Sequence, residues 1–436
     1  MASIQRRAWI IPGLLAALLA GCGKSAPKPR LEGRIIALSY VTPDGAGDVK
    51  KGGALIELFT DPRSGEVFSR PLVDVVFAAQ ISPDGRQVLY AAEKEIRLRS
   101  LQDNTDKVVV SEDTLTANEL ARIQAVTSRM EAQDRYSEAV ERQMAKEAVA
   151  EDIPEKCDSL SWATDGLTFS YTFKNHLFVS DLNGKTRRVW SAPQAAYDLY
   201  INGRYSATNQ RQGMLGGAVW VSPNSFVFQR FAGVMPERLP EKIDLLADNT
   251  STLAVIGEEI RLTDYPKRIY AYEACPRGPH VLFRNDPADP QMISSDFAHI
   301  DTVPPRRLWD APFPEWRFMP DGCRLYALQN TDGNLHFLQT DPETLKPVQG
   351  VKLGRGNPMG SVLHPNALMI ALAENDSDDF KHLRAVNVSL VDLTTGRKAR
   401  IFQTGMMKYS GWKPLVLLGW IAAGTASPGP NLIGGS

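Results

Sequence analysis

Short runs of alternating apolar and polar residues, each ending in a tight turn, recur along most of the chain. The clearest copy runs from residue 76 to residue 90, where two apolar runs flank the turn Ser82-Pro83-Asp84-Gly85. Proline sets φ, the aspartate side chain caps the turn and glycine supplies a positive φ, so this segment predicts a β-hairpin. Related turns follow at residues 162–166, 221–224, 274–278, 318–322, 363–366 and 411–414.

A second hairpin follows the first in most copies, because a turn containing glycine or aspartate again reverses an alternating apolar run. Residues 177–185, 335–341 and 388–396 show it most clearly. Four strands in each unit of about 45 residues match a propeller blade. The sequence therefore predicts an all-β fold, a β-propeller over residues 33–423. The seven turns indicate seven blades; six or eight remain open, because the strand of residues 35–40 has no obvious place.

The two ends of this region each predict half a blade. Residues 54–59 and 66–68 form a second hairpin without its first, whereas residues 407–412 and 415–422 form a first hairpin without its second. Sharing one blade between the N-terminal and C-terminal strands closes the ring and leaves no open sheet edge. Residues 415–422 are too short to span a membrane, which takes about 20 apolar residues.

The turn from Ser82 to Gly85 and its relatives resemble the propeller repeats of the TolB type, which are WD40-like. The resemblance covers most of residues 33–423, and it implies a fold rather than an activity. TolB recognises a peptidoglycan-associated lipoprotein, but this chain carries a lipid signal of its own. We therefore do not expect it to share that partner.

Between the first two hairpin units the pattern changes to that of a helix. Thr116 and Glu119 fit a capping box, and the run to about residue 150 lacks glycine and proline. We expect a long α-helical insertion over residues 115–153. Its apolar positions form an a/d-like stripe that is interrupted by polar residues: Ile123, Val126, Met130, Val140 and Met144. Two interpretations stay open: a helix folded back on the propeller, or a protruding arm that pairs with a partner.

Residues 1–21 predict an export signal. Arg6 and Arg7 precede an apolar stretch that ends in small residues before Cys22, which resembles the bacterial lipobox. We expect Cys22 to carry a diacylglycerol, since two acyl chains anchor stably, and residues 22–32 to form a tether. An ordinary signal with a chance cysteine is the alternative. Gly23 replaces the aspartate that favours inner-membrane retention in lipoproteins, so we expect a cell-envelope protein on the outer membrane.

Composition and charge narrow the picture only slightly. A hydrophobic content of 43% suits a globular protein, and the net charge of −1 gives no reason to expect nucleic acid as a partner. Three cysteines remain after Cys22, namely Cys157, Cys275 and Cys323. Cys275 and Cys323 fall near corresponding turns, so one disulfide is conceivable, but three buried thiols are the favoured interpretation.

No catalytic constellation is apparent. The histidines form no metal-binding pattern, His336 and His364 suit structural positions, and no serine lies in a nucleophile elbow. The acidic loop of residues 374–379 could hold calcium, with the loop of residues 42–48 beside it, although a solvated loop is favoured. We therefore expect no catalytic residue, no protein metal site and no cofactor.

An aromatic, proline-rich segment offers a second recognition surface beside the insertion. Trp309, Phe313 and Trp316 lie among four prolines, and an exposed cluster of this kind would bind a partner, whereas a buried one would cover a blade edge. We expect a protein-binding or scaffold module that docks another envelope protein. The alternatives are a propeller-type hydrolase or lyase with a calcium-dependent site in the central channel, and a structural role in envelope assembly. Residues 424–436 are expected to be a flexible tail.

Overall fold

The computed structural model describes residues 28–40, 52–115, 117, 157, 159–173, 176–190, 218–231, 250–256, 259–263, 270–275, 280–284, 290–293, 306–307, 315–320, 322, 324–331, 334–340, 347–356, 358–375, 385–404 and 415–423. The structural statements below concern this part of the chain. The predicted signal peptide, Cys22 and the tail of residues 424–436 lie outside it.

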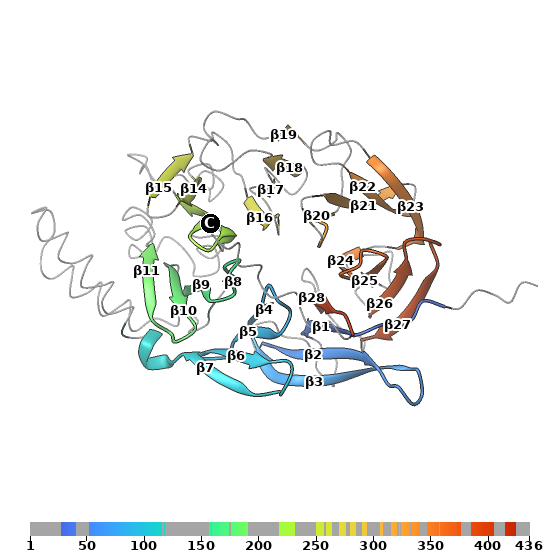
Figure 1. Cartoon of the computed structure of the whole chain (residues 1–436), viewed down its shortest axis with the longest axis horizontal. Helices are drawn as coiled ribbons and strands as arrows, with labels where there is room; N and C mark the ends of the chain where they lie inside the picture. The colour runs from blue at the N-terminus through green and yellow to red at the C-terminus, as the bar shows by residue number, and fades with distance from the viewer. Residues whose placement is uncertain are drawn as a thin grey trace, which may run out of the picture.

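The described residues form seven antiparallel sheets of four strands each, and Figure 1 shows these sheets as blades around a common centre. Blades 1 to 3 contain, from the centre outwards, β28 (Leu415–Ile421), β1 (Arg34–Ser39), β2 (Gly53–Thr60) and β3 (Val67–Val76); β4 (Ala78–Ile81), β5 (Gln87–Ala91), β6 (Ile96–Ser100) and β7 (Asp106–Val110); and β8 (Ser159–Trp162), β9 (Thr168–Phe173), β10 (His176–Asp181) and β11 (Thr186–Trp190).

The other four blades repeat this order of strands. They contain β12 (Val219–Ser222), β13 (Ser225–Phe231), β14 (Thr250–Ile256) and β15 (Glu259–Thr263); β16 (Tyr270–Ala274), β17 (Val281–Arg284), β18 (Pro290–Ile293) and β19 (Arg306–Arg307); β20 (Glu315–Phe318), β21 (Leu325–Thr331), β22 (Asn334–Thr340) and β23 (Pro347–Arg355); and β24 (Pro358–Leu363), β25 (Met369–Asn375), β26 (Val386–Asp392) and β27 (Lys398–Gln403). The predicted all-β propeller fold is confirmed.

The core lies between neighbouring blades. The second strand of a blade is covered on both sides, so β9 and β25 are buried along almost their whole length. Ile35 and Leu58 of blade 1 pack in one cluster with Ala371 and Val388 of blade 7. The rings of Tyr171 and Phe178 stack within blade 3, with centroids 5.1 Å apart. Apolar burial between blades therefore holds the ring together.

Strands from the two ends of the chain share blade 1. β28 pairs with β1, placing Leu417 opposite Ala37, and β1 continues to β2 and β3. The strand of residues 35–40, which the sequence left without a place, is therefore the second strand of this blade. The predicted division into two half-blades is wrong: the C-terminal end contributes one strand and the N-terminal end three, because Leu38 and its neighbours pair on both sides.

In five blades, the turn between the first and second strands follows one pattern. The backbone N–H of the residue before the turn donates to a carbonyl five residues later, over 2.8–2.9 Å. The pairs are Ser82 and Gln87, Ala163 and Thr168, Cys275 and His280, Met319 and Arg324, and His364 and Met369. The first residue of each pair is buried. These rings confirm the hairpins that the proline- and glycine-containing turns predicted.

The predicted insertion lies largely outside the described residues, and so do its five stripe residues Ile123, Val126, Met130, Val140 and Met144. Its beginning differs from the expectation. Residues 112–115 are already helical, and Ser111 caps this turn by accepting a hydrogen bond from the Thr114 N–H over 3.2 Å. The helix therefore starts ahead of the predicted capping box at Thr116. In the described part of the chain, no helix is long and apolar enough to cross a membrane.

Candidate functional site

The two ends of the blades differ in how the chain connects the strands. At one end, which we call the short-turn face, the first strand turns into the second and the third into the fourth. At the other end, the connection face, the second strand turns into the third and the chain passes to the next blade. The four longest gaps between successive strands all belong to the connection face, at residues 40–52, 111–158, 191–218 and 232–249.

The insertion begins and ends in one core cluster. Leu115 and Cys157 are both buried, and both pack in the cluster that contains Ile96 of blade 2 and Phe173 of blade 3. Two separate points of the chain are thus fixed at one place on the connection face. Apolar burial therefore holds both ends of the insertion against blades 2 and 3.

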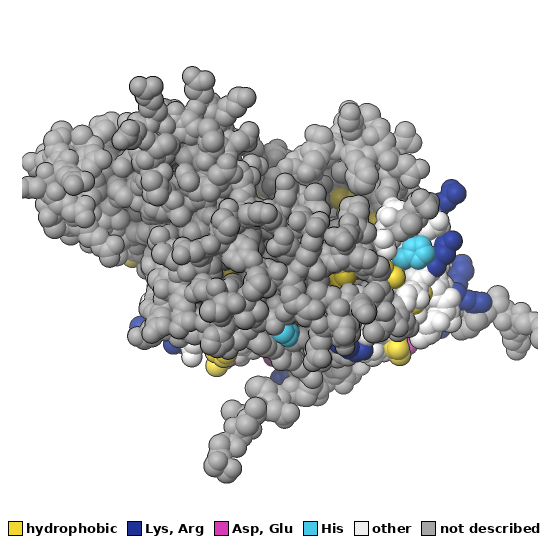
Figure 2. Space-filling view, turned by 90° about the horizontal axis from the view of Figure 1, so that it is seen from above, with side chains coloured by type: hydrophobic (Ala, Val, Ile, Leu, Met, Phe, Trp, Pro, Cys, Tyr) yellow, Lys and Arg dark blue, Asp and Glu magenta, His cyan; other side chains and the backbone are white. Residues whose placement is uncertain are grey.

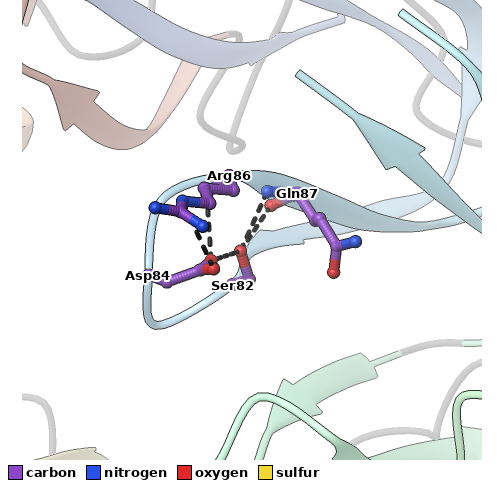
Figure 3. Close-up of polar contacts among 4 residues, drawn as sticks. All are labelled: Ser82, Asp84, Arg86 and Gln87. Carbon is purple, nitrogen blue, oxygen red and sulfur yellow. Dashed lines mark hydrogen bonds and ion pairs between the residues drawn. The ribbon is translucent and has the colours of Figure 1, made fainter. Parts of the chain in front are cut away.

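Several side chains in turns of the short-turn face bond within their own turns. The Ser82 hydroxyl donates to Asp84 Oδ1 over 2.6 Å and accepts from the Gln87 N–H over 2.9 Å, as Figure 3 shows. Asp84 Oδ1 also accepts from the Arg86 N–H over 3.0 Å. In blade 3, Asp165 accepts from two backbone N–H groups in the same way. These carboxylates cap their own turns rather than converge on a shared ligand position.

The two histidines considered in the sequence, His336 and His364, lie within a strand and a turn of the blades. His364 is buried in the blade 7 turn, where its Nδ1 accepts from the Asn366 N–H over 3.2 Å. Its ring meets Trp420 edge to face, with centroids 4.9 Å apart. His336 lies within β22. Among the described residues, no group of three or more His, Cys, Asp or Glu side chains is placed to hold a metal ion.

Glu374, the first residue of the acidic loop, does not fit the interpretation as a calcium ligand. Glu374 is buried, and the Lys398 ammonium group lies 2.5 Å from its Oε1. A buried carboxylate that already carries a full ion pair is not an open calcium ligand. Residues 376–379 and the neighbouring loop of residues 42–48 lie outside the described residues.

A second buried carboxylate is a feature that the sequence analysis missed. The Glu57 side chain is 3% exposed and pairs with Arg34 over 2.9 Å and with Arg70 over 2.5 Å. These pairs tie the three N-terminal strands of blade 1 together. The signal in the sequence is a single charge within the apolar run of residues 54–59, because such a residue is buried only with a partner.

Tyr90 has a strongly raised pKa. Burial, reinforced by the hydrogen bond from its hydroxyl to Asp106 over 3.0 Å, raises the pKa of Tyr90 to about 12. In contrast, the pKa of Asp392 is lowered, chiefly because its carboxylate accepts a hydrogen bond from the Thr394 hydroxyl. Tyr90 lies in β5 of blade 2, and Asp392 ends β26 of blade 7.

The structure describes one of the three predicted aromatic contact residues, Trp316. Trp316 lies in β20 and is only 1% exposed, packed in a cluster with Leu282 and Leu325. The prediction that Trp316 contacts a partner is therefore wrong, because the interface between blades 5 and 6 already covers its ring. Trp309 and Phe313 lie outside the described residues.

The cysteines also differ in part from the expectation. Cys157 is buried as a thiol, as predicted. Cys275 is in a disulfide, so the favoured interpretation of three buried thiols is wrong. Cys323, the partner that the turn positions suggested, lies outside the described residues.

No family model and no curated protein matches the chain. Among solved structures, it is similar to an acylaminoacyl peptidase from Pyrococcus horikoshii, with a TM-score of 0.49 and 11% identity over 87% of this chain and 52% of that one. An oligogalacturonate lyase in complex with manganese gives a TM-score of 0.49 and 11% identity, covering 88% and 89%.

The β-propeller domain of the Trilobed protease from Pyrococcus furiosus gives a TM-score of 0.47 and 10% identity, covering 86% of this chain and 97% of that domain. The chain is a β-propeller. It spans about half the length of the acylaminoacyl peptidase, and identities this low concern the fold and not the activity.

Proposed function

We propose that this chain is a lipid-anchored propeller of the cell envelope that binds another envelope protein through its connection face. The observation that carries the proposal is the unequal distribution of connecting segments. Among the described strands, the four longest separations along the chain belong to this one face, whereas on the opposite face the described turns between first and second strands are closed by their own hydrogen bonds in five blades. Connections longer than about 12–15 residues are uncommon in compact domains and usually have a function.

The insertion is the element of this face most suited to docking. Its stripe of apolar residues, Ile123, Val126, Met130, Val140 and Met144, repeats at helical spacing. The base is fixed by burial of Leu115 and Cys157. An apolar stripe interrupted by polar positions gives a contact of moderate strength, which suits a reversible partner.

The anchor follows from the sequence. Cys22 carries the diacylglycerol, and the propeller is held at the outer membrane through residues 22–32. No nucleic acid, protein-bound metal or cofactor is part of the proposal. An alternative function, a propeller hydrolase or lyase with a calcium site in the channel, is treated below as an outcome of the test.

The test is crosslinking in intact cells, followed by purification through a C-terminal tag and mass spectrometry. One variant replaces residues 117–155 with a short Gly-Ser linker and keeps Leu115 and Cys157 in place. A matched control replaces the exposed turn residues Asn183 and Lys185 with serine, on the short-turn face. We expect one recurrent envelope protein with the parent and the control, and its loss with the deletion.

Two results would contradict the proposal. The same partner recovered from the deletion variant would remove the insertion from the binding surface. Recovery of no envelope protein with the parent chain, together with a stoichiometric metal in the purified protein, would favour the channel enzyme.

A further inference from the structure

The outer strands of blades 6 and 7 carry an uneven distribution of charge. Lys352 and Arg355 on β23, Arg397 beside β27 and Arg400 on β27 are exposed. Neither β23 nor β27 contains an aspartate or a glutamate. We call these four cations, together with Lys398, the basic rim.

Contacts between the two strands make the basic rim one surface. The Lys398 ammonium group donates to the Arg355 carbonyl over 3.2 Å, and it also pairs with the buried Glu374. The turn before β27 approaches β23 closely, since a Cβ on Gly396 would lie 3.0 Å from the Lys352 carbonyl oxygen. Figure 2 shows Lys and Arg side chains gathered at the right-hand end of the molecule, the side on which β23 and β27 lie in Figure 1.

The two described acidic groups nearest the rim, Glu374 and Asp392, already have partners. Glu374 is already paired with Lys398 and is buried. Asp392 accepts hydrogen bonds from the Thr394 and Thr395 N–H groups of its own turn. Among the described residues, Lys352, Arg355 and Arg400 are thus exposed beside two acidic groups that already have partners.

The N-terminal tether leaves the propeller beside this rim. Leu31 is 4% exposed and packs in the cluster that contains Val388 and Phe402 of blade 7. The Thr60 hydroxyl donates to the Leu31 carbonyl over 2.7 Å, and Trp420 Nε1 donates to the Glu32 carbonyl over 2.7 Å. Figure 1 shows this first segment passing outwards next to β27.

The length of the tether restricts which surface can face the membrane. Cys22 lies nine residues ahead of Leu31, and nine extended residues reach about 30 Å. The base of the insertion lies in blades 2 and 3, on the other side of the ring in Figure 1. An anchor at Cys22 therefore brings the rim of blades 6, 7 and 1 towards the bilayer more readily than the rim of blades 2 and 3.

We infer that the basic rim rests on the anionic headgroups of the membrane in which Cys22 is anchored, with the insertion directed away from it. The inference rests on the lipid anchor of the proposed function. Cations of this kind gain energy within the headgroup region of an anionic leaflet, and the gain falls off within a Debye length of about 10 Å. The tether keeps the basic rim close to the bilayer, within the short range over which this electrostatic attraction acts.

A quenching experiment on the lipidated full-length protein tests the orientation. Vesicles of phosphatidylethanolamine and phosphatidylglycerol carry a headgroup quencher, and a fluorophore is attached at Gln403→Cys on β27 or at Asn183→Cys in blade 3; both residues are exposed. The buried Cys157 and the disulfide-bonded Cys275 do not compete for the label. We expect the label at residue 403 to be quenched more strongly than the label at residue 183.

Matched variants separate the rim from charge in general. Lys352→Gln with Arg400→Gln removes two cations from the rim, and Arg86→Gln with Lys185→Gln removes two from blades 2 and 3. Each rim cation is expected to favour the rim-down orientation about fivefold. The first pair, or vesicles of phosphatidylcholine alone, should therefore bring the quenching at residues 403 and 183 close together, whereas the second pair should leave the difference intact.

The outcomes distinguish this inference from the proposed function. Equal quenching of the two labels, or a difference that persists in phosphatidylcholine, overturns the basic rim as a membrane contact while the lipid anchor stands. A protein adduct from a photocrosslinker at residue 400 would assign the rim to an acidic protein instead and also overturns it. An N-terminal peptide without lipid on Cys22, seen by mass spectrometry, overturns both the anchor and the orientation.

Discussion

The two faces of this propeller are built from the same strands but connect them in opposite ways. On the short-turn face, the buried Ser82 hydroxyl and the Nδ1 atom of His364 accept hydrogen bonds from backbone N–H groups a few residues away. On the connection face, residues 111–158 separate two successive strands, and Leu115 and Cys157 near the ends of this segment are buried in one cluster. In the proposed function, stability and recognition are therefore assigned to different ends of the same blades.

This division gives a directly testable contrast. Small changes on the short-turn face should cost stability and leave partner binding unaffected. Large changes on the connection face should abolish partner binding and leave stability almost unchanged. The predictions below run from the largest expected loss of stability to the smallest.

Gly33→Ala should be the most damaging single change. Gly33 has a φ of 79°, and a Cβ there would lie 2.0 Å from the Ile421 carbonyl oxygen, where β1 begins beside β28. We expect a loss of about 4 kcal/mol or more, because the backbone of the shared blade must move. The shift of the urea unfolding midpoint between the parent protein and Gly33→Ala measures this loss of stability.

Gly65→Ala is the control for that change. Gly65 has a similar φ of 70°, but nothing lies within 4 Å of its added Cβ. It should cost only about 1–2 kcal/mol, from the left-handed backbone alone. Equal losses from the two substitutions would show that the contact between the ends of the chain adds no constraint.

Ser82→Ala should cost about 1–2 kcal/mol, because it removes the acceptor of the Gln87 N–H inside a buried turn. Ser222→Ala, in the half-exposed turn of blade 4, removes a longer bond of 3.3 Å to the Asn224 N–H and should cost less. Both are measured by urea unfolding. A larger loss from the second substitution would reverse the ranking of the two turns.

Tyr90 should give stability a specific dependence on alkaline pH. The folded pKa of about 12 lies above the ordinary value of 10.0, so the folded state holds its proton more tightly than the unfolded state. Stability from this source is complete below pH 10 and is lost as the pH rises towards about 12. Tyr90→Phe should lose about 1 kcal/mol at neutral pH and should lack this alkaline phase. If the urea midpoints of the parent protein and of Tyr90→Phe change by the same amount from pH 8 to pH 11.5, the prediction is contradicted.

Replacing residues 117–155 with a short linker should have the smallest effect on stability, within about 0.5 kcal/mol, because the buried ends at Leu115 and Cys157 remain. Thermal unfolding followed by circular dichroism measures it. A loss comparable to that of Ser82→Ala would mean that the insertion is part of the packed propeller, the folded-back interpretation that the sequence left open.

The turns could be predicted from the sequence because their chemistry is local. Proline, aspartate and glycine at residues 83–85 specify the backbone within a few residues, and the same reasoning located the other hairpins. Closure could not be assigned in this way. Residues 35–40 and 54–59 are both alternating strands, and periodicity gives no partner for either. Only the register of β1 against β28 shows that three strands come from the N-terminal end.

The candidate site shows the same limit. Trp316 and Phe318 alternate with charged residues in β20, a pattern that favours burial, but the surrounding prolines suggested an exposed loop. Glu374 was expected in a solvated acidic loop, with calcium binding as the alternative, because its partner Lys398 lies 24 positions away in the sequence. Composition alone does not show which side chains pair across strands or blades. Predictions of open ligand positions therefore fail where a partner that is distant in the sequence already occupies the position.

The most direct test of the central claim is site-specific photocrosslinking in intact cells. A photoreactive side chain is placed at Glu93 or Asp113, exposed on the connection face, and at Arg86 or Asn183, exposed on the short-turn face. The account predicts that the first pair yields an adduct with one envelope protein and that the second pair yields none. Adducts with that protein from Arg86 and Asn183, and none from Glu93 and Asp113, would contradict it.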